Sequence, residues 1–231
     1  DAVWDFTYRW DLRHLLLGLP LAQWGQAPLR AHIAAVASGR QRGPDGQPLP
    51  DGFDDLARSV GYITSHDVEH DHEQRFVNHV VMTQLRSDGM LPSGFPVERQ
   101  FELVQEVDAT LRTDPGRPDG MAGPWSSNLG LTTDAARRLA RLALDRVRSA
   151  HAVLLTSATI PMLLAGEESG DIHDTNHSAW QLKMSDPVDW WRQDTDGRRE
   201  LVAAVADLIH LRTGHPALHR NEVVLFHAHP T

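Results

Sequence analysis

The sequence predicts an α/β fold in which short apolar strands alternate with helices. Residues 60–64 contain β-branched and aromatic side chains, and ionisable residues follow them at once, as they would at the end of a buried strand. Residues 161–165 form a second short apolar run, which ends at Gly166. Between the two runs, apolar residues recur at helical spacing from about 133 to 154. We therefore expect two parallel strands at 60–64 and 161–165.

The other elements follow from apolar spacing and from residues that end helices. Gly18 and Pro20 end the first helix, Thr132 or Thr133 caps the long one, and Gly214 and Pro216 end the last. Residues 86–131 contain eleven Gly and Pro residues, which predicts an insertion over the face that carries the site. The further predicted elements are a strand at 2–6, helices at 8–18, 29–37, 76–85, 98–111 and 198–212, and loops at 40–54 and 166–195.

Composition excludes several classes of function. The net charge of −9 over 231 residues disfavours nucleic acid and anionic membranes as partners, because both need basic patches. It is compatible with a neutral polyol substrate. The absence of cysteine excludes disulfides, thiolate chemistry and Cys-type zinc sites, and it fits a reducing compartment such as the cytoplasm. No apolar run approaches the roughly 18 residues of a membrane span.

Two motifs give the chain a family resemblance. Two segments, in their order along the chain, resemble segments of the α-amylase family of glycoside hydrolases and glucanotransferases. They are Thr64-Ser-His66-Asp67 and Ile160-Pro-Met-Leu-Leu-Ala-Gly166-Glu167. In that family the first motif closes the seventh barrel strand and the second forms the eighth. Thr159 stands where the family usually has Gly.

The resemblance extends over nearly the whole chain. Residues 3–17 look like the sixth strand and its helix, and residues 208–218 look like the eighth helix and its exit. The resemblance implies a partial TIM (β/α)8 barrel, strands six to eight with their helices, over residues 1–219. It also implies the start of a C-terminal β-sandwich domain at 220–231.

The resemblance also implies roles for five residues. Asp67 is the catalytic residue that stabilises the transition state through the sugar hydroxyls, and His66 holds the same sugar ring. Glu69, Arg75 and Glu167 are expected to bind substrate. No metal or catalytic cofactor is expected; a structural calcium is compatible with the family, but the sequence identifies no ligands for it. The substrate expected is an α-glucan or an oligosaccharide.

Each of these residues also has a structural interpretation. Asp67 could cap the following helix, and His66 could be a buried histidine with its hydrogen bonds satisfied. Glu69 and Arg75 could form a solvated charge pair, and Glu167 could bind backbone or orient other groups. Outside this set, the adjacent Trp190 and Trp191 could stack on sugar rings or pack in the core.

The remaining catalytic carboxylates of the family cannot be identified in the chain. The family nucleophile is an Asp in an Arg-x-Asp setting on strand four, and a Glu on strand five is the acid/base. Arg86-Ser-Asp88 and Arg112-Thr-Asp114 share that spelling, but both follow the His-Asp motif and both lie in loop context. We therefore expect this chain to be an inactive fragment of a retaining α-glucan-active enzyme, α-amylase-like or branching-enzyme-like. Its nucleophile and acid/base would then lie outside it.

Two other interpretations remain open. The cluster His66, Asp67, His70 and His72 is compatible with a His-Asp metal-dependent phosphohydrolase, an all-helical fold. That fold would place the pair inside a helix, whereas Tyr62-Ile-Thr favours a strand. A barrel relative without catalysis would carry the same elements as an enzyme. The sequence decides neither hydrolase against transferase nor the oligomeric state.

Overall fold

The computed structural model describes a large part of the chain, in two compact units. The described residues are 2–19, 29–39, 47, 55–65, 75–91, 94–96, 99–110, 132–172, 188–195, 197–221 and 223. The first unit comprises residues 1–63, 148–163 and 204–231, and the second comprises residues 64–147 and 164–203.

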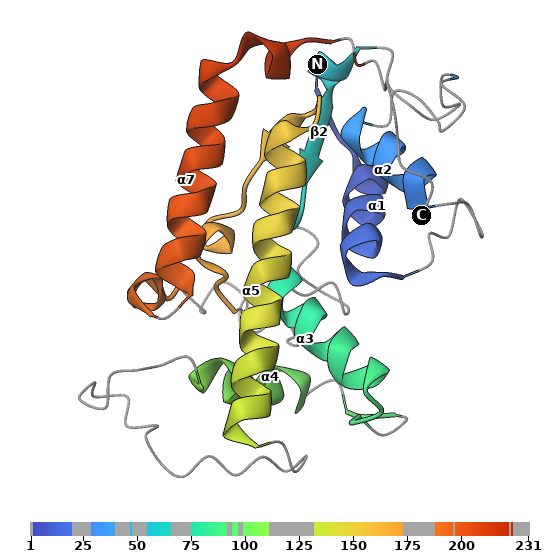
Figure 1. Cartoon of the computed structure of the whole chain (residues 1–231). Helices are drawn as coiled ribbons and strands as arrows, with labels where there is room; N and C mark the ends of the chain where they lie inside the picture. The colour runs from blue at the N-terminus through green and yellow to red at the C-terminus, as the bar shows by residue number, and fades with distance from the viewer. Residues whose placement is uncertain are drawn as a thin grey trace. The chain divides into compact units, whose positions relative to one another are not determined.

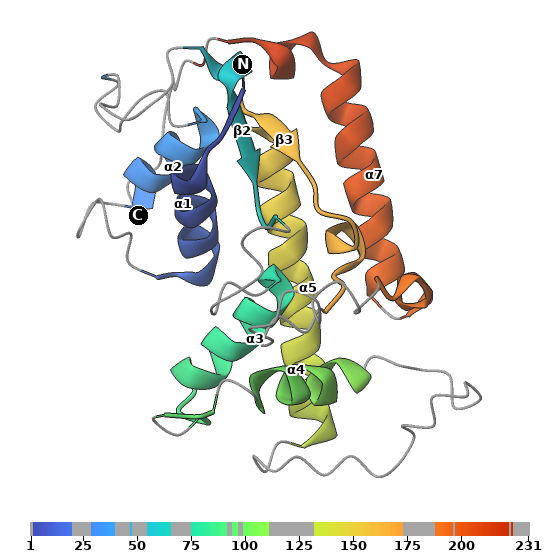
Figure 2. The same ribbon diagram turned by 180° about the vertical axis from the view of Figure 1, so that it is seen from behind.

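A three-stranded parallel sheet organises the first unit. Its strands β1 (Val3–Trp4), β2 (Ser59–Tyr62) and β3 (Ile160–Met162) lie in the order β1-β2-β3. Val60 pairs with Ile160 and Tyr62 with Met162, and β2 and β3 lie side by side in Figure 2. The parallel pairing of these two strands, expected from the sequence, is confirmed.

Four α-helices contribute to the described part of the first unit, two of them with all their residues. Helix α1 (Phe6–Leu17) begins two residues earlier than predicted, because the Asp5 side chain accepts a hydrogen bond from the Tyr8 N–H at 2.9 Å and caps it. Gly18, at φ +67°, ends α1 as expected. Helix α2 (Leu29–Ala37) lies beside α1 (Figure 1). The unit also contains the short helices η1 (Leu56–Arg58) and η6 (Pro216–His219), and the helical residues 148–156 and 204–214, which belong to two longer helices. Its core contains Tyr8, Leu12, Ala35, Val36, Leu56, Tyr62, Ile63, Leu154 and Leu155.

The second unit is built from helices. Helices α3 (Phe76–Ser87) and α4 (Gln100–Ala109) pack together, and both were predicted. The long helix α5 (Thr133–Thr156) contributes its residues up to Val147, and Thr132 caps it by accepting from the Ala135 N–H at 3.2 Å. The other elements are η4 (Glu167–Ser169), η5 (Trp190–Asp194) and the first turns of α7 (Arg198–Gly214).

Strands β2 and β3 are shorter at their carboxyl ends than the apolar runs predicted. Their pairing stops at Tyr62 and Met162, and Leu164 already accepts from the Glu167 N–H at 3.0 Å in the turn that follows. An apolar run shows that a segment is buried, whereas a strand also needs a hydrogen-bonding neighbour. Three parallel strands with helices are compatible with part of a barrel, and the barrel itself stays a prediction.

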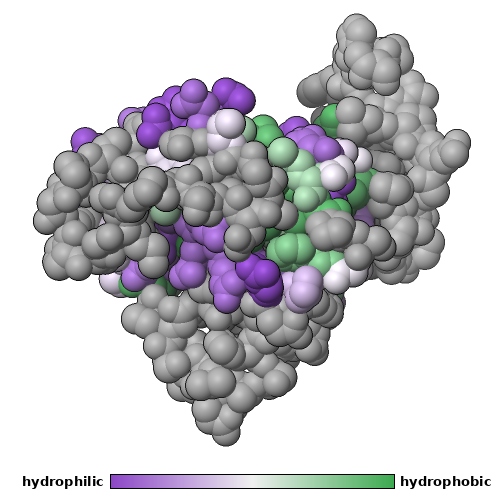
Figure 3. Space-filling model, turned by 90° about the horizontal axis from the view of Figure 1, so that it is seen from below, coloured by the Kyte–Doolittle hydropathy of each residue, from purple (hydrophilic) through white to green (hydrophobic). Residues whose placement is uncertain are grey.

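The face drawn in Figure 3 exposes described residues of mixed character. In Figure 3 hydrophilic residues, in purple, lie next to hydrophobic ones, in green. The helices in the described part of the chain do not include one with the length and apolar character needed to cross a bilayer. Most of the predicted C-terminal domain at 220–231 and of the predicted loop at 40–54 lies outside the described residues.

Candidate functional site

The chain remains buried after β2 ends. Ile63, Thr64 and Ser65 are all at most 1% exposed, so the segment that leads to the His-Asp pair runs through the interior. His66, Asp67 and Glu69 lie outside the described residues, and their roles stay predictions. Of the five predicted site residues, Arg75 and Glu167 are described, and both belong to the second unit.

Arg75 lies immediately before helix α3 and points inward. Its side chain is 2% exposed, and Nη1 donates to the carbonyl oxygen of Ala165 at 2.8 Å. A buried guanidinium needs hydrogen-bond acceptors to offset the loss of water, and a backbone carbonyl supplies one here. Arg75 therefore connects the start of α3 to the turn that follows β3.

Glu167 is the first residue of that turn and is 3% exposed. The preceding Gly166 has φ +91°, a conformation that favours glycine, and a Cβ there would approach Asp171, Val188 and the Arg75 guanidinium within 3.0–3.3 Å. The Gly166 N–H donates to Glu168 Oε2 at 2.9 Å, and Ser169 Oγ donates to the Gly166 carbonyl at 3.0 Å. Local hydrogen bonds thus define the turn that orients Glu167.

Arg75 and Glu167 meet at one small cavity. Asp171 also lines it, so one guanidinium and two carboxylates surround the same space. The cavity is about 10 Å³, which is room for about one water molecule and far too small for a sugar ring. The structure therefore brings these two predicted residues together in a buried polar cluster, and a direct contact of either with sugar stays a prediction.

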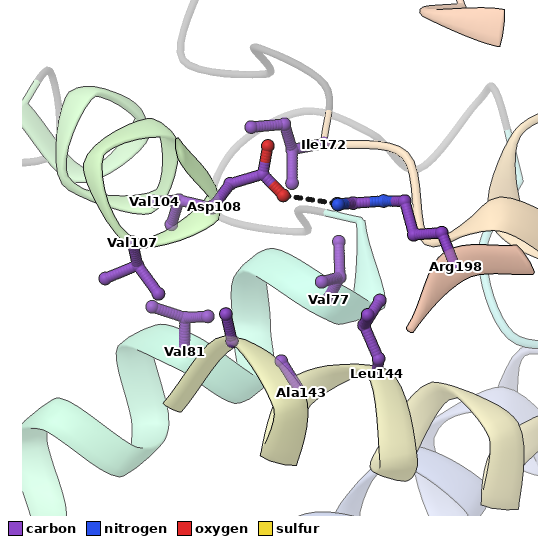
Figure 4. A pocket seen from close by; sticks show the side chains of 10 residues that line it. Val77, Val81, Val104, Val107, Asp108, Ala143, Leu144, Ile172 and Arg198 are labelled. Atoms are coloured by element: carbon purple, nitrogen blue, oxygen red, sulfur yellow. Dashed lines mark hydrogen bonds and ion pairs between the residues drawn. The ribbon is translucent and has the colours of Figure 1, made fainter. Parts of the chain in front are cut away.

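A second group of buried charges lies in the same unit. Asp108, at the end of α4, accepts hydrogen bonds from Arg192 and Arg198, and we call these three residues the Asp108 ion cluster. All three are at most 5% exposed. In Figure 4 the Asp108 carboxylate and the Arg198 guanidinium face each other beside a small apolar cavity lined by Val77, Val81, Val104, Val107, Ala143, Leu144 and Ile172.

The two arginines connect the cluster to the turn after β3. Arg198 Nη2 donates to the Gly170 carbonyl at 3.0 Å, and Arg192 Nε lies 3.6 Å from Asp171 and 2.8 Å from Asp189. Burial by itself lowers the pKa of Arg192, but Asp108, Asp189 and Asp171 outweigh it and raise that pKa above its ordinary value. Arg192 therefore keeps its positive charge in the interior.

The two adjacent tryptophans, Trp190 and Trp191, have different environments. The Arg192 guanidinium lies 5.3 Å from the centre of the Trp191 ring, so Trp191 is held against the ion cluster. Trp190 is 54% exposed. The packing interpretation is thus supported for Trp191, whereas the Trp190 side chain does not belong to the core.

The Asp108 ion cluster was missed by sequence reasoning. Asp108 and Arg192 are 84 positions apart, and Asp108 lies in the segment that was interpreted as an insertion over the site. Single charged residues in a helix are usually solvated, and no spacing rule relates residues of three separate segments. Among the described residues no group of three or more His, Asp or Glu is placed to hold a metal ion.

Comparison with known proteins gives partial matches. The chain is 38% identical over 109 residues to a glycogen debranching enzyme of Klebsiella pneumoniae subsp. pneumoniae, a match that covers 45% of this chain and 15% of that protein. It is 37% identical over 108 residues to a glycogen debranching enzyme of Yersinia pestis, with the same coverage. The matches thus span about 15% of the length of these curated relatives. No protein-family model matches the chain.

Proposed function

We propose that this chain is part of a retaining α-glucan-active enzyme that cleaves or transfers α-glucosidic bonds. The observation that carries the proposal is the parallel pair β2–β3, because a predicted site motif follows the carboxyl end of each strand. In parallel α/β folds, ligands bind at the carboxyl ends of the strands. Similarity to proteins named glycogen debranching enzymes supports an α-glucan as the substrate class.

In the proposed mechanism this chain stabilises the transition state. Cleavage of a glucosidic bond passes through an oxocarbenium-like state, and hydrogen bonds to sugar hydroxyls that strengthen there lower the barrier by several kcal/mol. We assign these bonds to the Asp67 carboxylate and assign ground-state binding of the same ring to His66. The nucleophile and the acid/base are proposed to come from polypeptide outside these 231 residues.

Arg75 and Glu167 have a supporting role in this proposal. Both are buried around a cavity too small for sugar, and Arg75 is bonded to the backbone that precedes the Glu167 turn. We propose that they hold the segments that follow β2 and β3 in a fixed arrangement, and so orient the groups that contact substrate. Glu69 remains assigned to substrate binding on the resemblance alone.

The substitution Asp67→Asn in the intact enzyme tests the proposal. The variant keeps the shape of the side chain but loses the charge that opposes the developing cation. We expect kcat on glycogen or maltooligosaccharides to fall about a hundredfold or more, corresponding to about 3 kcal/mol. His66→Ala should have a smaller effect and should change KM as well as kcat. Release of reducing ends and redistribution of chain lengths measure hydrolysis and transfer separately.

Asp134→Asn is a matched control, because Asp134 is exposed in the first turn of α5. It should leave kcat and KM unchanged. If Asp67→Asn has near-normal kcat and is merely less stable by about 1 kcal/mol, Asp67 is a helix cap and the proposed function fails.

A further inference from the structure

The turn that carries Glu167 is held from two sides within the second unit. On one side Arg75 Nη1 donates to the Ala165 carbonyl at 2.8 Å. On the other, Arg198 donates to the Gly170 carbonyl at 3.0 Å, and Arg192 lies 3.6 Å from Asp171. Two buried guanidinium groups therefore bond the backbone on either side of Glu167, at Ala165 and Gly170, and a third lies at ion-pair distance from the Asp171 carboxylate at the end of the turn.

Asp108 is the acid shared by the two arginines on the far side of the turn. Arg192 has two other carboxylates near it, Asp171 and Asp189. Within the described part of the chain, the other acceptors of Arg198 are neutral, namely the Gly170 carbonyl and Thr195 Oγ1. Removing the Asp108 charge would leave a buried Arg198 without a compensating carboxylate, a costly state that the protein would relieve by moving the guanidinium.

The helix that carries Asp108 is anchored without it. Thr110 Oγ1 donates to the Val107 carbonyl at 2.7 Å, and Arg137 Nε donates to the Thr110 carbonyl at 3.1 Å, which ties the end of α4 to α5. Val104 and Val107 are each 1% exposed and pack in the same unit. Loss of the Asp108 charge should therefore disturb the arginines and the turn more than it disturbs α4.

We propose that Asp108 is a positioning residue for the reaction, acting through Arg192 and Arg198 to fix the Gly166–Asp171 turn and the orientation of Glu167. This inference rests on the proposed function. It also gives the segment at 86–131 a role in the site, since α4 lies in this segment and supplies the carboxylate on which the turn depends.

The test compares Asp108→Asn and Asp108→Glu in the intact enzyme. A small misplacement of positioned groups costs up to about a hundredfold in rate, so we expect Asp108→Asn to lower kcat on maltooligosaccharides about ten- to a hundredfold with KM changed less than about twofold. Asp108→Glu keeps the charge and should retain more activity than Asp108→Asn. Circular dichroism and a denaturation midpoint show whether each variant is folded.

Glu102→Gln is the matched control, since Glu102 lies on the same helix in an exposed ion pair with Arg99 at 3.4 Å. It should leave kcat unchanged. A second readout separates positioning from stability: in a Glu167→Gln background, Asp108→Asn should lower kcat much less than it does alone, because both changes affect the same turn.

Three results would overturn the inference: normal kcat in Asp108→Asn, additive effects of Asp108→Asn and Glu167→Gln, or a loss that equals the unfolded fraction. If Asp108→Asn does not fold, a folded Arg198→Lys variant with normal kcat overturns it as well, because Arg198 is the residue that joins Asp108 to the Gly170 carbonyl. The proposed function fails separately, through an active Asp67→Asn variant. Loss of activity in Asp67→Asn beside normal Asp108 variants would reject the positioning role alone.

Discussion

Gly61 and Thr159 share one space in the interior of the first unit. A Cβ at Gly61 would lie 2.5 Å from Thr159 Oγ1 and 2.9 Å from Tyr8 Cε1, closer than atoms can approach. Thr159 is 1% exposed, and its hydroxyl is 3.1 Å from Ser157 Oγ, which in turn is 2.9 Å from the Tyr8 hydroxyl. The threonine at the position where the resembled family usually has Gly is therefore accommodated by the glycine opposite.

We predict that Gly61→Ala lowers the free energy of unfolding by about 1–3 kcal/mol, because the added methyl overpacks a rigid site. Chemical denaturation measures the change. Gly214→Ala is the control, since among the described residues no atom outside the chain neighbours and the helix's own nearby backbone lies within 4 Å of a Cβ at that position. Adding Thr159→Gly to Gly61→Ala should restore part of the loss; a double variant less stable than both single ones would contradict the shared-space argument.

At the scale of elements, Arg212 of α7 joins the end of α5 to the start of β3. Its guanidinium donates to the carbonyls of Leu155 at 2.9 Å, Ser157 at 2.8 Å and Thr159 at 2.7 Å. Leu155 lies in the last turn of α5, where a helix leaves its carbonyls without internal partners, and Ser157 and Thr159 follow the helix. One side chain thus ends the long helix and holds the chain as it enters the sheet.

Arg212→Met is predicted to lower the free energy of unfolding by about 2–4 kcal/mol, because three carbonyls lose a charged donor while the aliphatic stem is kept. Arg212→Lys should keep only part of the stability that Arg212→Met loses, since an ammonium cannot donate to three carbonyls with the planar geometry of a guanidinium. Arg146→Met, at an exposed position of α5, is the control. If Arg212→Met lowers the free energy of unfolding no more than Arg146→Met does, water replaces these hydrogen bonds and the prediction is wrong.

The elements were predictable where local signals decide them. Thr132 and Gly18 marked helix ends, and helical spacing found α3, α5 and α7. The predicted strands extended beyond the carboxyl ends of β2 and β3, because strand pairing depends on a neighbouring strand and not on one segment alone. In the site, Arg75 and Glu167 were found through motifs, whereas Asp108 needs three segments brought together by folding, which no local pattern encodes.

At the scale of the whole molecule, catalysis is expected to require more than this chain. If the nucleophile and the acid/base lie outside it, as proposed, the purified 231-residue chain should release no reducing sugar from glycogen. The intact enzyme assayed at the same molar concentration is the positive control. Measurable turnover by the chain alone would mean that a carboxylate within it, such as Asp88 or Asp114, acts as nucleophile.

The contact between Asp171 and Arg192 has a consequence for how the molecule can change over evolution. Their separation of 3.6 Å brings together two points of the chain with residues 172–191 between them. In the unfolded chain, the entropy cost of bringing two such points together grows only logarithmically with the number of residues between them, by about 0.6 kcal/mol for each doubling. A change in that number therefore alters the cost of forming the pair very little. A homologue with a longer or shorter segment between the two positions is expected to keep the acid and the base that join its ends.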